Sequence, residues 1–283
     1  MTIAEMLDSL SHELAGTGIP PARAEARDLI AAVLGRPRFW PSANPSLELD
    51  ETALVAIRGA AGRLARGMPF QYAVGTAPFR HLTLRVDQRV LIPRQETELL
   101  VDLVLSVAGG GAVADIGTGS GAIALSLACE GRYDRIIGTD VSEDALAVAR
   151  QNLEVVPIER RASVEFRAGD LLDPVRGERL QAVVSNPPYI SRSEERDLPA
   201  AVRDWEPHLA LFSDDDGMAA IRAILRDAPF VLESGGVLVL EIDAGRAADA
   251  RDSAATDAQW RDVELRVDLT GRERFLVARR QEW

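Results

Sequence analysis

The tetrapeptide Asn186-Pro-Pro-Tyr189 offers two hydrogen-bond acceptors that suit a planar NH2 group. The Asn186 side-chain oxygen can accept one N–H, and the Pro187 backbone carbonyl can accept the other. Such a nitrogen is a poor nucleophile because its lone pair is delocalised, so the acceptors would act by positioning and polarising it. Pro187 and Pro188 fix φ without adding donors, and Tyr189 presents a flat face. We predict that Asn186, Pro187 and Tyr189 are catalytic and that the whole tetrapeptide holds the substrate; the alternative is a plain proline turn.

The segment Asp115-Ile-Gly-Thr-Gly-Ser-Gly121 has the composition of a loop that approaches a ligand closely. It lies between two apolar runs, at 113–116 and 122–128, which predict a strand before the loop and a helix after it. Glycines at 117, 119 and 121 allow positive φ and close backbone approach. The spacing is not the GxGxxG of dinucleotide folds, and no lysine follows as in a P-loop. A tight turn between strand and helix is the alternative.

Two carboxylates end the next apolar runs of the chain. Asp140 closes the run at 135–140, about twenty residues beyond the glycines, where an acidic side chain can accept hydrogen bonds from both ribose hydroxyls. Asp170 closes the run at 164–170, where it could accept from an adenine amino group. A further strand at 181–186 delivers Asn186 at its carboxyl end, which is where open α/β sheets bind ligands. The four strand ends therefore predict one crevice.

Composition limits the classes of protein that the chain can belong to. With 283 residues, 47% of them hydrophobic, it can fill the core of one substantial α/β domain and of a smaller one. A single cysteine, Cys129, excludes an internal disulfide and a cysteine-based zinc cluster, and no metal is expected. The net charge of −12 opposes a large phosphate-binding surface. The start lacks a basic leader and no apolar run reaches about 20 residues, so we expect a cytoplasmic protein with no membrane partner.

The first 75 residues predict a small helical bundle. Apolar residues recur there at helical spacing, and each stripe needs a partner helix to bury it. We expect the first helix to begin at the capping pattern Thr2–Glu5 and to end at Gly16. The second should begin at Pro20-Pro21 and end at Gly35, and the third should begin at Asp50 and end at Gly67. Residues 36–45 are expected to form a loop. The bundle is either a structural cap or a docking surface for a macromolecular substrate.

From Phe70 onward the pattern changes to a period of two, and residues 76–93 predict a linking β-hairpin with strands at 79–86 and 90–92. Residues 94–283 form the third region, in which Glu96, Thr97 and Glu98 begin a helix and either serve as helix-start residues or face a ligand. Polar residues 191–204 predict a mobile lid. A helix is expected at 217–231, a buried strand at 235–242 and an antiparallel hairpin formed by 263–267 and 275–278. The fold class is therefore α/β, a doubly wound sheet with an antiparallel C-terminal end.

These motifs together resemble class I S-adenosylmethionine methyltransferases with a Rossmann-like sheet. More narrowly, the chain resembles the glutamine N5-methyltransferases that modify peptide-chain release factors, the HemK/PrmC family. Asn-Pro-Pro-Tyr alone also occurs in adenine-N6 enzymes, so the neighbouring segment is the more specific sign. The matching segments are Phe70-Gln-Tyr72 with Gly75 and Phe79, Val90-Leu-Ile-Pro-Arg94 with Glu96-Thr-Glu98, Asp115–Gly121, Asn186–Ile190 and Glu206-Pro207.

The resemblance implies S-adenosyl-L-methionine as cofactor, with S-adenosyl-L-homocysteine as product, and a release factor as protein substrate. The implied cofactor-binding residues are Asp115, Gly117, Thr118, Gly119, Gly121, Asp140, Asp170, Leu171 and Asn186. We expect a monomer that binds no nucleic acid stably. The chain departs from the usual family pattern at Gln95, at Asp243 and Arg246, and at Ser213–Asp216, which bears on the identity of the acceptor.

The leading hypothesis is methyl transfer to a glutamine side chain in a Gly-Gly-Gln-type loop of a release factor. The enzymatic alternatives are a ribosomal protein glutamine, adenine N6 or a small metabolite. The non-enzymatic alternative is a cofactor-binding scaffold that docks a partner, and the intact Asn186 tetrapeptide argues against it. Acidity and the lack of an obvious DNA-recognition domain count against DNA.

Overall fold

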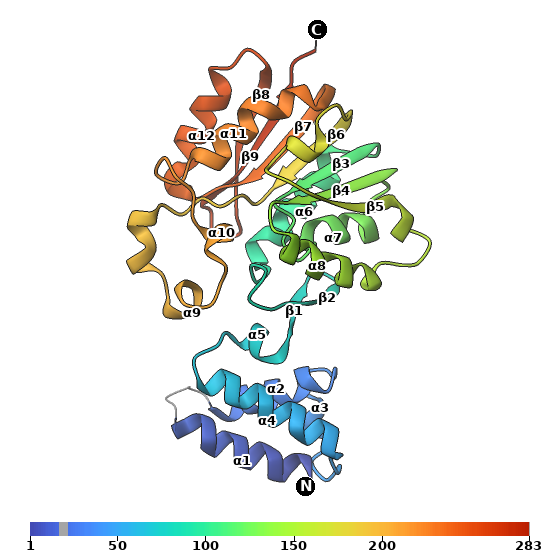
Figure 1. Cartoon of the computed structure of the whole chain (residues 1–283), viewed down its shortest axis with the longest axis vertical. Coiled ribbons are helices and arrows are strands. Elements are labelled where there is room, and N and C mark those ends of the chain that lie inside the picture. The colour runs from blue at the N-terminus through green and yellow to red at the C-terminus, as the bar shows by residue number, and fades with distance from the viewer. Residues whose placement is uncertain (17–21, 283) are drawn as a thin grey trace. The chain divides into compact units, whose positions relative to one another are not determined.

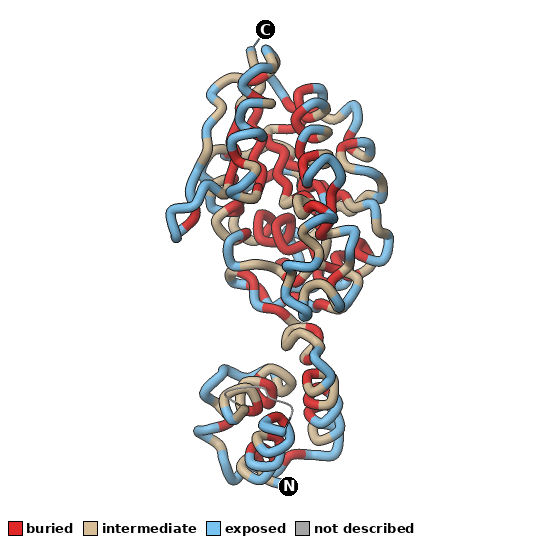
Figure 2. Tube along the Cα trace, turned by 90° about the vertical axis from the view of Figure 1, so that its left-hand side faces the viewer, coloured by how far each residue is buried: buried red, intermediate tan, exposed pale blue. Residues whose placement is uncertain are grey.

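A computed structural model describes residues 1–16 and 22–282, apart from the side chain of Ala162. Contacts between Cα atoms divide the chain into two units. One unit contains Met1–Thr76 and Ala200–Trp205, and the other contains Ala77–Pro199 and Glu206–Trp283. Each unit has its own buried core (Figure 2). No helix of the described residues is long and apolar enough to cross a membrane.

The N-terminal unit is helical because its amphipathic segments are capped as the sequence predicts. The Thr2 N–H donates to Glu5 Oε2 over 2.9 Å and the Glu5 N–H donates to Thr2 Oγ1 over 3.3 Å, which satisfies two free donors of the first helix. Asp50 accepts from Ala53 N over 2.7 Å and caps the fourth helix. The helices are α1 Ile3–Gly16, α2 Ala22–Val33, α3 Trp40–Ala43, α4 Glu51–Ala65 and α5 Phe70–Val74 (Figure 1).

Two expectations for this region were wrong. Residues 36–45 contain the short helix α3, in which Pro41 occupies the first turn where its missing N–H costs nothing. Phe70–Val74 is helical and not extended, and the Arg63 guanidinium holds it by donating twice to the Ala73 carbonyl, over 3.1 and 2.8 Å. The predicted helix start at Pro20-Pro21 lies outside the described residues.

The linking hairpin exists, but its strands differ from the prediction. They are β1 Thr76–Phe79 and β2 Leu82–Arg85, and residues 90–92 are not a strand. Arg80 adopts a left-handed φ of 51° in the turn, a conformation that the sequence does not signal because no Gly or Asn stands there. Its guanidinium donates to Glu130 over 2.8 and 2.7 Å, and its N–H donates to Glu98 over 3.0 Å. These contacts compensate for the unfavourable backbone.

The second unit is built on a seven-stranded sheet of order β5-β4-β3-β6-β7-β9-β8, as the predicted fold class requires. The strands from β3 to β7 run parallel, and β9 and β8 add an antiparallel edge. The chain order reverses between β3 and β6, so that pair marks the switch point of the sheet. The strands are β3 Ala112–Ile116, β4 Arg135–Asp140, β5 Val164–Ala168, β6 Leu180–Ser185, β7 Leu232–Glu241, β8 Trp260–Val267 and β9 Glu273–Arg280.

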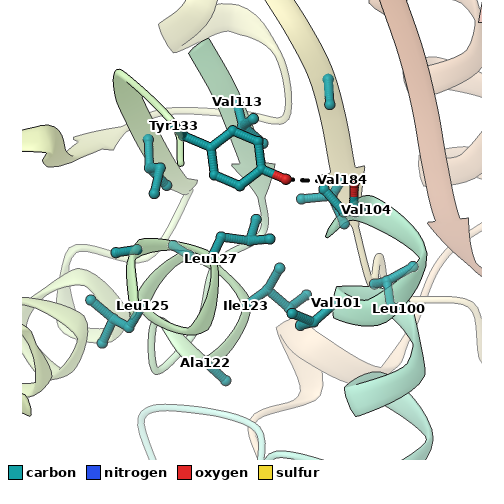
Figure 3. Packing of buried hydrophobic residues seen from close by; sticks show 14 of the residues in the cluster. Leu100, Val101, Val104, Val113, Ala122, Ile123, Leu125, Leu127, Tyr133 and Val184 are labelled. Carbon is teal, nitrogen blue, oxygen red and sulfur yellow. Dashed lines mark hydrogen bonds between the residues drawn. The ribbon is translucent and has the colours of Figure 1, made fainter. Parts of the chain in front are cut away.

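Alternate residues of the central strands enter two separate cores. Val113 and Val184 pack with α6 and α7 on one face, whereas Ala114 and Val183 pack with α11 and α12 on the other. Figure 3 shows part of the first core, where the Tyr133 hydroxyl reaches the end of α6. Because helices cover both faces of the sheet, we expect the site at the ends of its strands.

The helices of the second unit complete its layers and connect the strands (Figure 1). The predicted helix at 217–231 is shorter, and α12 was not predicted from the sequence. The predicted lid at 191–204 contains a 3-10 helix and α9, and α9 belongs to the N-terminal unit. The α-helices that follow β2 along the chain are α6 Gln95–Val107, α7 Ala122–Glu130, α8 Glu143–Asn152, α9 Ala200–Arg203, α10 His208–Leu211, α11 Ala219–Asp227 and α12 Ala247–Ala255. The 3-10 helices are Leu153–Val155, Arg161–Ser163, Asp173–Val175, Arg192–Asp197, Ala228–Phe230 and Ala244–Arg246.

Candidate active site

The glycine loop and the Asn186 tetrapeptide leave the sheet side by side. Ile116 at the end of β3 pairs with Ser185 at the end of β6, and the Ser185 hydroxyl donates to the Ile116 carbonyl over 2.6 Å. Both strands run parallel, so the segments that follow them start at the same edge of the sheet. A cavity of about 250 Å³ opens there, and residues of both segments line it. The position at the switch point is where open α/β sheets bind ligands.

The glycine loop keeps its backbone open toward the cavity. Gly117 and Gly119 line the cavity at φ values of 72° and 56°, and an added Cβ at either would meet no protein atom within 4 Å. Gly121, at φ 82°, is the N-cap residue of α7. The loop is held from behind, because Thr118 Oγ1 donates to Asp115 Oδ2 over 2.6 Å and the Ala124 N–H donates to the same oxygen over 3.1 Å. The glycines therefore leave space for a ligand.

Asp115 supports the loop from a fully buried position. Its side chain is 0% exposed, and Oδ1 is buried without a hydrogen-bond partner in the described residues. Burial raises the pKa of this carboxyl from 3.8 to about 7. Three of the predicted cofactor-binding residues do not line the cavity and lie behind the loop, namely Asp115, Thr118 and Gly121.

Asp140 lies at the end of β4 with both carboxylate oxygens engaged by backbone. Oδ2 accepts from Gly119 N and Oδ1 accepts from Ser142 N, each over 2.9 Å. Each carboxylate oxygen can accept a second hydrogen bond, so the group can hold the loop and still bind two hydroxyls. Burial raises the pKa of Asp140, and the backbone donors oppose that rise. Asp140 lines the cavity together with Asp170 and Leu171.

Leu171 carries backbone strain at the rim of the cavity. Its φ is 41°, which is unfavourable for a residue with a branched side chain. Thr139 Oγ1 donates to the Leu171 carbonyl over 3.1 Å and keeps the backbone in place. Strain of this kind persists where the surroundings fix it, and it is concentrated at functional sites.

Asn186 faces the cavity with a defined amide orientation. Its Nδ2 donates to Thr97 Oγ1 over 3.1 Å, and Thr97 Oγ1 donates to Glu241 Oε2 over 2.7 Å. Asn186 Oδ1 accepts no hydrogen bond within the described part of the chain. Of the other tetrapeptide residues, Pro188 lines the cavity, whereas Pro187 is buried and Tyr189 is half-buried outside the lining. Burial also raises the pKa of Tyr189 to about 12.

Two further segments line the cavity, and the sequence did not indicate that they belong to the site. Residues 89–91 and 207–212 both contribute to the lining. Glu206, only 4% exposed, joins them by accepting from Arg94 over 2.6 Å and from Ile92 N over 3.4 Å. The sequence signal was the match at Val90–Arg94 and Glu206-Pro207, but it did not indicate that the two segments meet.

Three of the departures from the family pattern lie together, namely Asp243, Arg246 and the turn at 213–216, whereas Gln95 is the exposed first residue of α6. Arg246 donates to the Asp216 carbonyl and to Glu194, each over 2.6 Å, and to Asp243 over 3.3 Å. Gly217, at φ 87°, packs so closely on the Tyr189 carbonyl that a Cβ would lie 2.2 Å from the oxygen. The turn at 213–217 therefore supports the segment that follows Asn186.

The arrangement brings most predicted site residues into one cavity. Those that line it are Gly117, Gly119, Asp140, Asp170, Leu171, Asn186 and Pro188. The roles assigned to them stay predictions. The open glycine backbone and the half-free Asp140 carboxylate fit a nucleoside-type cofactor. Within the described residues, no group of three or more His, Cys, Asp or Glu side chains is placed to hold a metal ion.

Comparison with known proteins identifies relatives over the whole chain. Residues 5–75 match the PrmC N-terminal domain, and residues 95–202 match the methyltransferase small domain. The chain is 40% identical to a release factor glutamine methyltransferase of Moorella thermoacetica, with 100% of both chains covered. It is 38% identical to that of Geobacter sulfurreducens, with 87% of this chain and 86% of the relative covered. It is 34% identical to that of Deinococcus radiodurans over 99% of each.

Solved structures support the fold at low sequence identity. A methyltransferase from Pyrococcus furiosus aligns with a TM-score of 0.52 at 16% identity, over 71% of this chain and 89% of its own. The catalytic domain of hMettl16, in complex with MAT2A 3'UTR hairpin 6, aligns with a TM-score of 0.56 at 15% identity, over 84% of both chains. These likenesses confirm the Rossmann-like methyltransferase sheet.

Proposed function

The chain belongs to the family of release factor glutamine methyltransferases, and we propose that it transfers a methyl group from S-adenosylmethionine to the side-chain amide nitrogen of a glutamine in a peptide-chain release factor. The observation that carries this proposal is Asn186 at the end of β6. Asn186 lines a cavity shared with the glycine loop, and its amide oxygen accepts no hydrogen bond from the described residues. A planar NH2 group can donate there.

The lining residues that would hold S-adenosylmethionine are Gly117, Gly119, Asp140, Asp170 and Leu171. We assign the ribose to Asp140, because its two oxygens each keep one acceptor position. Asp170 and Leu171 would contact the adenine, and the glycine loop would lie beside the methionine portion. When bound, the cofactor supplies an electrophilic methyl group attached to a sulfonium.

The chain contributes orientation and electrostatics to the reaction. Asn186 Oδ1 accepts one amide N–H of the substrate glutamine and the Pro187 carbonyl accepts the other, which fixes the nitrogen for attack. Residues 89–91 and 207–212 line the same cavity and would shield the bound amide from water. Tyr189 follows directly, and its raised pKa keeps the phenol protonated at neutral pH.

We assign the docking of the release factor to the helices of residues 1–75, with residues 76–93 as the link to the methyltransferase domain. The net charge of −12 supports a protein acceptor over a nucleic acid. We further propose that the protein acts as a monomer in the cytoplasm, with no membrane partner.

An acceptor competition tests the proposal. The full chain is incubated with radiolabelled S-adenosylmethionine and, in parallel reactions, with a purified release factor, a ribosomal protein preparation, DNA and a metabolite extract. Label in the release factor is the expected result. Label found only in DNA, ribosomal protein or small molecules would show that the methyl acceptor is not a release factor. No transfer to any of these acceptors would contradict the assigned activity.

A further inference from the structure

Thr97 and Glu241 form a buried polar chain that ends on Asn186. Thr97 lies in the first turn of α6 and is 5% exposed, and Glu241 is the last residue of β7 and is 2% exposed. Leu240 of β7 pairs with Ser185 of β6, so the next residues along each strand, Glu241 and Asn186, are neighbours. Glu241 directly follows the buried apolar residues Val237–Leu240, where a carboxylate is costly to bury, so its position at this site calls for an explanation.

When Glu241 is ionised, the hydrogen bonds that link Asn186, Thr97 and Glu241 can be donated in only one direction. A carboxylate only accepts, so the single hydroxyl proton of Thr97 is committed to Glu241 Oε2, 2.7 Å away. Thr97 Oγ1 can then only accept from Asn186, which must present its NH2 group across the 3.1 Å contact. A flipped amide would face Thr97 with its oxygen, and no proton would lie between the two oxygens.

We propose that Thr97 and Glu241 are positioning residues that fix the Asn186 amide with its oxygen toward the acceptor nitrogen. The inference rests on the proposed function, because it assigns to the pair the orientation that glutamine methylation needs. Neither residue touches the substrate or the cofactor in this role. The flipped amide would offer donors to a substrate NH2 group and could not hold it.

The surroundings of Glu241 make the direction of these bonds sensitive to pH. Burial raises the pKa of Glu241 to about 7; Thr97 and the nearby Arg274 and Arg94 oppose the rise, and Glu96 adds to it. The charge of Glu241 also raises the pKa of Tyr189. When Glu241 is protonated, it can donate to Thr97, whose hydroxyl is then free to donate to Asn186 and favour the flipped amide. Activity should therefore fall as pH drops through about 7.

Three variants of the full chain test the inference. Thr97→Val keeps the shape of the side chain without the hydroxyl, Thr97→Ser keeps the hydroxyl, and Glu241→Gln removes the ionisation. Ser126→Ala is the matched control, since it removes a buried hydroxyl in α7 that has no hydrogen-bond partner in the described residues. The measurements are kcat and KM for the release factor, calorimetric affinity for S-adenosylhomocysteine, thermal unfolding, and the pH profile of kcat.

Thr97→Val should lower kcat on the order of tenfold to a hundredfold, the scale of a misoriented catalytic group. Its affinity for S-adenosylhomocysteine should stay within about twofold, and Thr97→Ser should recover most of kcat. Glu241→Gln should lose the fall in kcat between about pH 8 and 6. The control should match the wild type in both kcat and pH profile.

A Thr97→Val enzyme with wild-type kcat would overturn the inference, and so would equal losses in the Val and Ser variants. If Thr97→Val does not fold, the profile of Glu241→Gln decides the question, because an unchanged pH dependence also contradicts the proposal. Failure of the wild type to methylate the release factor would instead contradict the proposed function.

Discussion

Replacing Asp140 with alanine should weaken cofactor binding by more than the removal of one negative charge from the protein would explain. The Asp140 carboxylate accepts from Gly119 N and Ser142 N, each over 2.9 Å, and retains one acceptor position on each oxygen. The variant would lose two ribose hydrogen bonds and would also release the Gly119 N–H that holds the glycine loop. Both effects act on the same edge of the cavity.

The size of the effect follows from the kind of bond that is lost. Hydrogen bonds to a charged group contribute about 1.5–3 kcal/mol each, and part of that is offset because the carboxylate and the ribose hydroxyls lose their remaining hydration on binding. A net loss of roughly 1–3 kcal/mol corresponds to a dissociation constant about 5 to 150 times larger. Asp140→Asn keeps one oxygen and should fall between the wild type and Asp140→Ala.

Isothermal titration calorimetry with S-adenosylhomocysteine measures this directly, because the product binds without turnover. Asp144→Ala is the matched control, since Asp144 is an exposed carboxylate four residues away that does not line the cavity. The control should bind like the wild type. An Asp140→Ala protein that is folded and binds the product as tightly as the control would refute the assignment of Asp140 to the ribose.

Three further changes probe other parts of the site. Asn186→Ala should nearly abolish transfer while S-adenosylhomocysteine affinity stays within about tenfold, and unchanged turnover would exclude the mechanism. Gly119→Ala should cost about 1–2 kcal/mol of stability, because its φ is 56°, and should weaken product binding further by placing a methyl group in the cavity; calorimetry and chemical unfolding separate the two effects. Asp115→Asn should gain stability relative to the wild type as pH rises, because burial raises the Asp115 pKa from 3.8 to about 7. In the wild type, Asp115 therefore binds its proton more tightly in the folded state than in the unfolded state. Its contribution to the free energy of unfolding is complete below about pH 4. That contribution is lost as the pH rises from about 4 to about 7, by at most about 1.4 kcal/mol per pH unit. Unfolding midpoints in urea across this range that run parallel for both proteins would contradict it.

Strand ends were predictable from the sequence because apolar runs there stop at residues with a distinct chemistry. Asp140 closes β4, the segment at 115–121 begins with the last two residues of β3, and Asn186 directly follows β6. The strand order, which places β3 beside β6, depends on packing between distant segments and was not predicted; only the binding of ligands at the carboxyl ends of the strands followed from the general rule for open α/β sheets. The predicted crevice therefore has a physical basis in the sequence.

Other parts of the site depend on contacts that no local pattern encodes. Thr97 could be read as a helix-start residue, and Glu241 is 144 positions away in a buried strand. The charged residue within the apolar run before Ile242 was a usable signal, because an isolated carboxylate is not buried without a partner. The hairpin was misplaced because Arg80 takes a left-handed conformation that ion pairs with Glu130 stabilise, without the glycine that usually marks such a turn.

In the proposed function, the cavity holds a glutamine side chain for methylation of its amide nitrogen. Tandem mass spectrometry of a release factor, after reaction with the wild-type protein or with Asn186→Ala, tests it most directly. We expect a single added methyl group on the side-chain nitrogen of one glutamine with the wild type, and none with the variant. A methyl group on another residue or another atom, or equal methylation by Asn186→Ala, would contradict it.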